Sequence, residues 1–198
     1  SASVISSLHD AAKLVDLGAD FRLEDGAKWA KYYGGDHAGT WTYGAPELPG
    51  ARALIAKSSK VANPGCYATA IALGIAPATK IADVEDVVVV AASGTTGAGR
   101  SAKINLLASE VMGSLTSYKF GGVHQHTPEI EEAITRSTGK ASRISFTPIL
   151  APMPRGILAT ITMKLQPAVT SKQARLAFEK AYTDEEFVHL LPEGQMPK

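Results

Sequence analysis

Cys66 is the only cysteine in the 198-residue sequence, and it directly follows Pro64 and Gly65. A Pro-Gly pair favours a turn, and residues 67–75 have helical spacing, so the thiol is expected at or beside a helix N-terminus. The dipole and free N–H groups there stabilise a thiolate and can form an oxyanion hole, with Asn63 as a further donor. The alternative is a small buried hydrophobe, and position alone does not separate the two.

A candidate base lies in "GGVHQHTPEIEE", which holds His124 and His126 just before a predicted helix. If residues 123–126 are extended, the two imidazoles point to opposite faces, so only one could face a given thiol unless the chain turns. Glu129 could orient the ring of His126 or stabilise its charge. The alternatives are surface histidines or a zinc pair. Zinc is disfavoured, because no cysteine cluster or H-E-x-x-H motif supplies further ligands.

A glycine-rich loop lies in "AASGTTGAGRSAKINLL" between a predicted strand and a predicted helix. Gly94, Gly97 and Gly99 let the backbone approach a ligand and direct N–H groups at an anion, and Arg100 could add charge. The spacing G-x-x-G-x-G differs from the dinucleotide fingerprint G-x-G-x-x-G. The glycines could equally build a tight turn.

The elements that position these residues form an α/β pattern. Strands are predicted over 14–17, over 87–92 as a β-branched run buried on both faces, over 142–150, and over 156–167 as a half-exposed strand. Helices are predicted over 67–75, 102–112, 128–137 with Thr127 as N-cap, and 171–182 with a capping box of Thr170 and Gln173. Residues 32–50 are predicted to form a long ordered loop.

Composition limits the function classes. The 20 Lys and Arg nearly balance the 19 Asp and Glu, so charge favours neither nucleic acid nor an acidic membrane as a partner. No apolar run approaches the roughly 18–20 residues that span a bilayer. One cysteine cannot form an internal disulfide, which favours a cytoplasmic location. Both ends of the sequence are interpreted as cuts in a longer protein, because the chain opens in a helix end and stops in a loop.

The segment "VANPGCYATA…GIAP" resembles the active-site signature of the N-acetyl-γ-glutamyl-phosphate reductase family of arginine biosynthesis. Further segments that resemble this family, in the same order, are "VDLGADFRL", "YGAPELPG", "SGTTGAGR", "GVHQHTPEIE", "FTPILAPMPRGILATI" and "LPEGQMP". The resemblance implies the latter part of a Rossmann-type dinucleotide-binding domain over 1–62. A semialdehyde-dehydrogenase-like catalytic and dimerisation domain with a mixed or antiparallel sheet, incomplete at its C-terminus, follows over 63–198.

The resemblance also implies the chemistry. Cys66 would attack an acyl phosphate and form a thioester, which NADP(H) reduces to N-acetylglutamate semialdehyde. His126 is the first choice as acid and base, with His124 and Glu129 in support. The resemblance also implies that residues 93–99 contact the cofactor or the substrate phosphate. The cofactor-binding residues it implies are Ser93, Gly94, Gly97 and Gly99. Substrate binding is assigned to Asn63 and Arg155, although Arg155 could instead form a structural ion pair, and Arg22 and His37 are weaker candidates.

Other functions stay open at this stage. A Cys-His hydrolase or acyltransferase would share the thiolate and imidazole, and a chain without its dinucleotide half would turn nothing over. A related reductase acting on aminoadipyl or aspartyl phosphate is also compatible with the residues.

We expect residues 157–165 at the centre of the catalytic sheet, with helices on one face. The other face would pair with a second subunit in a homodimer or homotetramer.

Overall fold

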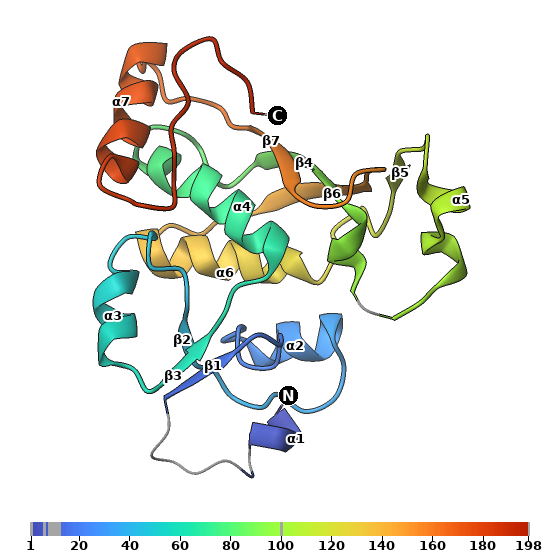
Figure 1. Ribbon diagram of the computed structural model, residues 1–198. Coiled ribbons are helices and arrows are strands. Elements are labelled where there is room, and N and C mark those ends of the chain that lie inside the picture. Colours follow the sequence, from blue (N-terminus) through green and yellow to red (C-terminus); the bar gives the residue numbers. More distant parts are fainter. Residues whose placement is uncertain (1, 6, 8–12, 100, 198) are drawn as a thin grey trace.

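Two β-sheets organise the chain in the computed structural model, which describes residues 2–5, 7, 13–99 and 101–197 (Figure 1). The first sheet is parallel, in the order β1-β3-β2. The second has the order β5-β6-β4-β7. The strands are β1 (Leu14–Asp16), β2 (Thr42–Tyr43), β3 (Lys60–Ala62), β4 (Val87–Ser93), β5 (Thr116–Ser117), β6 (Ile144–Leu150) and β7 (Ile157–Thr162).

The four-stranded sheet is mixed, as predicted. β4 runs parallel to β6, with Val87 opposite Ile144, whereas β7 is antiparallel to β4 and β5 is antiparallel to β6. The prediction that residues 157–165 occupy the centre was wrong. Although β7 follows β6 along the chain, it pairs with β4, which places it at an edge of the described sheet and leaves β4 and β6 in the middle.

Among the described residues, helices cover one face of this sheet and leave the other exposed. Val87, Val89 and Ala91 of β4 are buried, whereas Val88 and Val90 are 45% and 41% exposed. The prediction that β4 is buried on both faces was therefore wrong. The prediction of helices on one face is confirmed, because α4 (Cys66–Ile75) and α6 (His126–Thr138) pack side by side against the buried face (Figure 1).

The other helices are short, except for one. They are α1 (Ala2–Ile5), α2 (Gly26–Tyr32), α3 (Ala51–Lys57), α5 (Ala108–Val111), the 3₁₀ helices η1 (Ala76–Lys80), η2 (Thr95–Ala98) and η3 (Ile104–Leu106), and α7 (Ser171–Tyr182). α7 has the predicted capping box of Thr170 and Gln173. None of the helices in the described ranges is long and apolar enough to span a membrane.

The helix predicted over 102–112 was wrong. Leu107 has extended backbone angles (φ −64°, ψ 150°), which separate η3 from α5. Ile104 is 81% exposed and Met112 is 72% exposed, so the described residues do not bury these side chains in the way that would hold a continuous helix together.

α6 makes polar contacts with Glu24, in the segment between β1 and α2. The backbone N–H of Glu24 donates to the Glu132 carboxylate at 2.7 Å, and the Arg136 guanidinium pairs with Glu24 at 2.6 Å. The loop predicted over 32–50 is confirmed apart from β2, whose Tyr43 reaches into the core beside α6. The first 62 residues therefore contact the helix that carries the candidate histidine.

Candidate active site

Cys66 is the first residue of α4, and Gly65 is its N-cap. The thiol is exposed, although Pro64 and Gly65 before it are buried. Two hydrogen bonds fix the first turn of this helix, because the N–H and the hydroxyl of Thr69 both donate to the Gly65 carbonyl, at 2.8 and 3.0 Å. The predicted position at a helix N-terminus is therefore confirmed.

The thiol opens into a cavity of about 700 Å³. Five parts of the chain line it: the start of α4, the end of β4 with the glycine-rich loop after it, the segment 103–119, residues 124–126 at the start of α6, and the end of β6. The lining residues are Cys66, Tyr67, Ser93, Gly94, Gly97, Ala98, Lys103, Asn105, Leu106, Glu110, Val111, Thr116, Tyr118, Lys119, His124, Gln125, His126 and Leu150.

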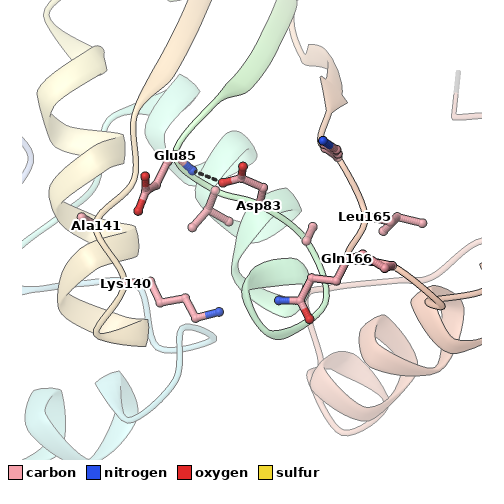
Figure 2. A pocket seen from close by; sticks show the side chains of 10 residues that line it. Asp83, Glu85, Lys140, Ala141, Leu165 and Gln166 are labelled. Atoms are coloured by element: carbon pink, nitrogen blue, oxygen red, sulfur yellow. Dashed lines mark hydrogen bonds between the residues drawn. The ribbon is translucent and has the colours of Figure 1, made fainter.

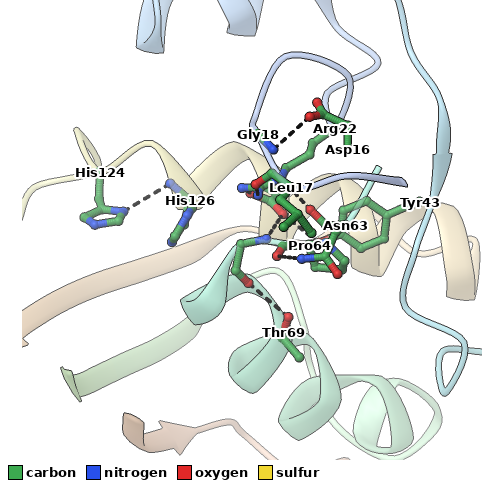
Figure 3. A network of polar contacts seen from close by, with 12 residues as sticks. Asp16, Leu17, Gly18, Arg22, Tyr43, Asn63, Pro64, Thr69, His124 and His126 are labelled. Carbon is green, nitrogen blue, oxygen red and sulfur yellow. Dashed lines mark hydrogen bonds and ion pairs between the residues drawn. The ribbon is translucent and has the colours of Figure 1, made fainter. Parts of the chain in front are cut away.

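The two histidines lie together because the chain turns before α6. Residues 121–125 form turns and a bend, so the two imidazoles share one side with centroids 5.0 Å apart. His124 Nδ1 accepts a hydrogen bond from the His126 N–H at 3.1 Å (Figure 3). α6 begins at His126 with Gln125 at the N-cap, so the prediction of Thr127 as N-cap was wrong. The ring of His124 fills that end of the helix instead.

His126 lies against the turn that carries the thiol. A Cβ built on Gly65 would come 2.4 Å from Nε2 of His126 and 2.9 Å from Nη1 of Arg22. A glycine is therefore required here by space, since its angles (φ −69°, ψ 155°) are open to any residue. The imidazole of His126 packs directly on the residue that precedes Cys66, and both side chains line the same cavity.

Both imidazoles are held neutral near pH 7. Burial, followed by the charges of Arg22 and Lys119, lowers the pKa of His126 to about 4. Burial, followed by His126 and Lys119, lowers the pKa of His124 to about 3. Nδ1 of His126 is buried without a hydrogen-bond partner among the described residues. One nitrogen of a neutral imidazole carries no proton and can accept one, and Nε2 of His126 is the nitrogen that lies against the Gly65 turn.

Glu129 contacts the thiol-bearing turn. Its carboxylate accepts hydrogen bonds from the Gly65 N–H at 2.7 Å and the Tyr43 hydroxyl at 2.9 Å, and Arg22 Nη1 lies 3.4 Å away. The side chain is 1% exposed. The hydrogen bonds of this carboxylate therefore fix the backbone before Cys66.

Arg22 and Asn63 form hydrogen bonds with the backbone of the same turn before Cys66. The Arg22 guanidinium donates to the carbonyls of Asn63 at 2.7 Å and Leu17 at 3.0 Å (Figure 3). The Asn63 amide donates to the Pro64 carbonyl at 3.1 Å. Arg22 is thus engaged with protein acceptors on each side.

The glycine-rich loop is tied to the backbone of residues 153–156. The N–H groups of Gly94, Thr95 and Thr96 donate to the carbonyls of Gly156, Met153 and Pro154, respectively. A Cβ on Gly94 would meet the backbone of Arg155 at 2.7 Å, so this glycine serves close packing. Ser93, Gly94 and Gly97 reach the cavity, whereas Gly99 is not among its described lining residues. Arg100 lies outside the described residues.

Arg155 and His37 lie away from the thiol. The Arg155 side chain is exposed and is not among the described residues that line the cavity. His37 Nε2 is 2.9 Å from the Leu23 carbonyl, beside Trp29. The structure therefore brings together Cys66, both histidines and part of the glycine loop, but not these two residues.

Sequence reasoning missed four cavity residues. Lys103 and Lys119 supply positive charge, and Lys119 Nζ donates to Gln125 at 3.1 Å. The Tyr118 hydroxyl donates to Tyr67 at 3.1 Å, and Tyr67 donates to a backbone carbonyl. Lysines at scattered positions give no spacing signal. Tyr67, directly after the cysteine and at the start of a helix, was the one detectable candidate.

A second hollow of about 500 Å³ lies at the other end of β4 (Figure 2). Asp83, Glu85, Lys140 and Lys164 contribute charges of both signs, and Asp83 accepts from the Glu85 N–H at 2.9 Å. Its described lining residues include no cysteine, histidine or serine. Its charged groups are carboxylates and lysine amines, and it lies away from Cys66 and the two histidines, none of which is among its described lining residues.

Comparison with known proteins defines the class of this site. Residues 66–198 match the family model described as semialdehyde dehydrogenase, dimerisation domain. The chain is also similar to aspartate semialdehyde dehydrogenase II of Vibrio cholerae complexed with ASA (13% identity, TM-score 0.55, 79% of this chain and 52% of that chain). It is likewise similar to a probable aspartate-semialdehyde dehydrogenase of Pseudomonas aeruginosa (15%, 0.55, 79% and 52%). At these identities the likeness concerns the fold. The chain belongs to the semialdehyde dehydrogenase family.

Curated relatives narrow the similarity further. The chain is 62% identical over 200 residues to N-acetyl-gamma-glutamyl-phosphate reductase of Acidothermus cellulolyticus, and 55% identical over 198 residues to the reductase of the same name from Streptomyces coelicolor. Each match covers 100% of this chain and 58% of the relative, so the chain spans a little over half of their length. The resemblance found in the sequence motifs is confirmed.

Proposed function

We propose that this chain carries the catalytic centre of an NADP-dependent reductase that converts N-acetyl-γ-glutamyl phosphate to N-acetylglutamate semialdehyde, in arginine biosynthesis. The observation that supports this most is the exposed Cys66 at the N-terminus of α4, with the neutral imidazole of His126 packed on the preceding residue. The names of the relatives suggest the substrate, and the geometry of the site supports Cys66 as the nucleophile and His126 as the base.

The first half of the reaction needs only residues of this chain. A proton passes from the Cys66 thiol to the imidazole of His126, and Sγ attacks the acyl carbon to form a C–S bond. The tetrahedral oxyanion faces the N–H groups at the start of α4. Collapse of this intermediate breaks the bond between the acyl carbon and the phosphate oxygen and leaves a thioester on Cys66. The phosphate leaves with its bonding electron pair and takes a proton from solvent, whereas His126 keeps the proton of the thiol.

The second half reduces the thioester. Bound NADPH would supply a hydride to the thioester carbon. The imidazolium of His126 then donates its proton toward the resulting oxygen, and it takes the proton back when the C–S bond breaks and the aldehyde leaves. The thiolate that departs is the one that attacked, because sulfur is both a strong nucleophile and a good leaving group.

The described residues fit only the reacting end of a nicotinamide cofactor. The cavity beside Cys66 is about 700 Å³, which leaves room for an acyl chain and a flat ring. By contrast, the N–H groups of Gly94, Thr95 and Thr96 are paired with carbonyls and are not free to hold a pyrophosphate. The proposed cofactor contacts of Ser93, Gly94, Gly97 and Gly99 are therefore limited to close approach of the loop.

Charge favours an anionic substrate. Lys103 and Lys119 line the cavity and outnumber its one described carboxylate, Glu110, and they are better placed than Arg155 to meet a phosphate or carboxylate. Asn63 remains a proposed contact through its half-buried amide. The cavity residues do not distinguish the acetylglutamyl chain from an aminoadipyl or aspartyl one, so the substrate length rests on the relatives' names.

The uncovered face of the second sheet supports an oligomer. Val88, Val90 and Leu158 are 41–51% exposed on neighbouring strands β4 and β7. The family model that matches residues 66–198 is described as a dimerisation domain. We propose that this face pairs with a second subunit in a homodimer or homotetramer.

The resemblance to the reductase family is also the basis for two further proposals. Residues 1–62 belong to the cofactor domain and residues 63–198 to the catalytic domain, and the protein is cytoplasmic.

The test is reduction of an acyl phosphate by the full-length protein. Oxidation of NADPH, followed at its near-ultraviolet absorbance, should depend on N-acetyl-γ-glutamyl phosphate and release phosphate in equal amount. Cys66→Ser should lower turnover by several orders of magnitude and leave folding intact. Phosphate release without NADPH oxidation would favour the Cys-His hydrolase instead.

A further inference from the structure

Tyr43 is not among the described residues that line the cavity. Its hydroxyl nevertheless contacts the Glu129 carboxylate, which binds the backbone of Gly65 before Cys66. Tyr43 is on β2 of the first sheet and is 6% exposed. Its hydroxyl donates to Oε1 of Glu129 at 2.9 Å, and the same oxygen accepts from the Gly65 N–H at 2.7 Å. One carboxylate oxygen therefore connects β2 to the residue before Cys66.

The charge of this carboxylate is compensated from one side. Arg22 Nη1 lies 3.4 Å from Oε2, whereas Tyr43 and Gly65 share Oε1. Burial, followed by the charge of Glu129, raises the pKa of Tyr43 well above its ordinary value, so the hydroxyl keeps its proton at any physiological pH. The Tyr43 hydroxyl therefore donates to Oε1 at all times. This hydrogen bond fixes the position of the carboxylate and reduces the negative charge on Oε1 near Cys66.

We infer that Tyr43 is a positioning residue for Cys66, acting through Glu129 on the Gly65 N–H. The inference rests on the proposed function only for its kinetic consequence. Without the Tyr43 hydroxyl, the carboxylate is held less firmly and is less neutralised. Both changes disfavour a thiolate at the start of α4, because the turn is looser and the nearby negative charge is stronger.

The chain offers a matched pair of substitutions. Tyr43→Phe keeps the ring, which packs under the Arg136 guanidinium at 5.1 Å, and removes only the hydroxyl. Tyr182→Phe likewise removes one hydroxyl from a buried tyrosine, 4% exposed, that donates at 2.6 Å to the carbonyl of Leu73 in α4. The control thus loses a hydrogen bond to the same helix, two turns after Cys66, with no contact to Glu129.

The first readout needs neither substrate nor cofactor. In the full-length protein at pH 7, iodoacetamide should alkylate Cys66 about fivefold more slowly in Tyr43→Phe, and within about twofold of the wild-type rate in Tyr182→Phe. Hydrogen exchange of the peptide that contains Gly65 should be faster only in Tyr43→Phe.

The second readout is turnover. Tyr43→Phe should lower kcat about tenfold with KM within about twofold, since a positioning defect acts on the chemical step.

Two results would overturn the inference. One is wild-type alkylation and exchange in Tyr43→Phe. The other is an equal loss in both variants, which would indicate a general effect of stability, measured in parallel by thermal unfolding. If the wild-type protein fails to reduce the acyl phosphate, the proposed function fails, but alkylation and exchange still decide the role of Tyr43.

Discussion

Replacing Gly65 with alanine tests the contact between His126 and the turn before Cys66. The backbone angles of Gly65 (φ −69°, ψ 155°) suit alanine, so the substitution introduces no backbone strain. Its only effect is to place a methyl group where the structure has the imidazole, 2.4 Å from Nε2 and 2.8 Å from Cδ2 of His126.

The size of the effect follows from these distances. Ordinary van der Waals contact begins at 3.4 Å, so the ring or the turn must move by about 1 Å. Arg22 Nη1, at 2.9 Å, resists a shift in its direction. A displacement of about 1 Å between a nucleophile and its base costs about 100-fold in rate, which corresponds to about 2.7 kcal/mol of transition-state stabilisation. Overpacking should lower the free energy of unfolding by about 1–3 kcal/mol.

The assay is steady-state NADPH oxidation by the full-length protein, together with urea unfolding. Gly26→Ala is the control, because its new Cβ would meet another histidine, His37, at ordinary contact distances of 3.6 Å to its Cβ and 3.7 Å to its ring atom Nδ1. We expect Gly26→Ala to keep kcat within about twofold of wild type. Wild-type kcat in Gly65→Ala would refute the placement of His126 at the turn. So would a loss of kcat that persists undiminished when Gly65→Ala is added to His126→Asn, because that double variant has no base left to displace.

Three further predictions concern the histidines and the open sheet face. His126→Asn should lower kcat at least about tenfold more than His124→Asn, because His126 packs on the turn before Cys66, and the opposite order in kcat would exchange their roles. Burial, as the largest cause, lowers the pKa from 6.5 to about 4 in His126 and to about 3 in His124, so the unfolded chain binds protons that the native chain excludes. The free energy of unfolding should therefore fall as the pH drops from about 6.5 toward 4, by up to about 1.4 kcal/mol per pH unit for each histidine, and urea unfolding at several pH values that gave no slope would contradict this. Val90→Glu, on the exposed face of β4, should dissociate the proposed oligomer in light scattering, whereas an unchanged mass would place the interface elsewhere.

The parts of the fold that follow local rules were predicted from the sequence. The Pro-Gly turn placed Cys66 at a helix N-terminus, and the capping residues Thr170 and Gln173 fixed the start of α7. β4 and β6 were found from their β-branched and apolar runs. Each of these signals is contained within about ten residues, so no tertiary partner is needed to interpret it.

The errors arose where a distant partner decides the outcome. β7 lies at an edge because it pairs with β4, a choice that its own alternating sequence does not encode. The segment 102–112 has helical spacing, but Ile104, Leu107 and Met112 are left exposed by the residues that the structure describes. The start of α6 is a local exception, because the ring of His124 accepts a hydrogen bond from the N–H of His126, two residues away, and the helix begins at His126 instead of after Thr127. Glu129 was predicted beside His126 from its spacing, whereas its hydrogen bonds reach Gly65 and Tyr43, 64 and 86 residues away in sequence.

The central claim is that the Cys66 sulfur takes the acyl group from the phosphate. The most direct measurement is intact-mass and peptide mass spectrometry of the full-length protein after mixing with N-acetyl-γ-glutamyl phosphate in the absence of NADPH. We expect one acyl group per chain on the peptide that contains Cys66, with one phosphate released and with the adduct lost on addition of NADPH. Phosphate release with no adduct on Cys66, or an acyl group on another residue, would contradict the account.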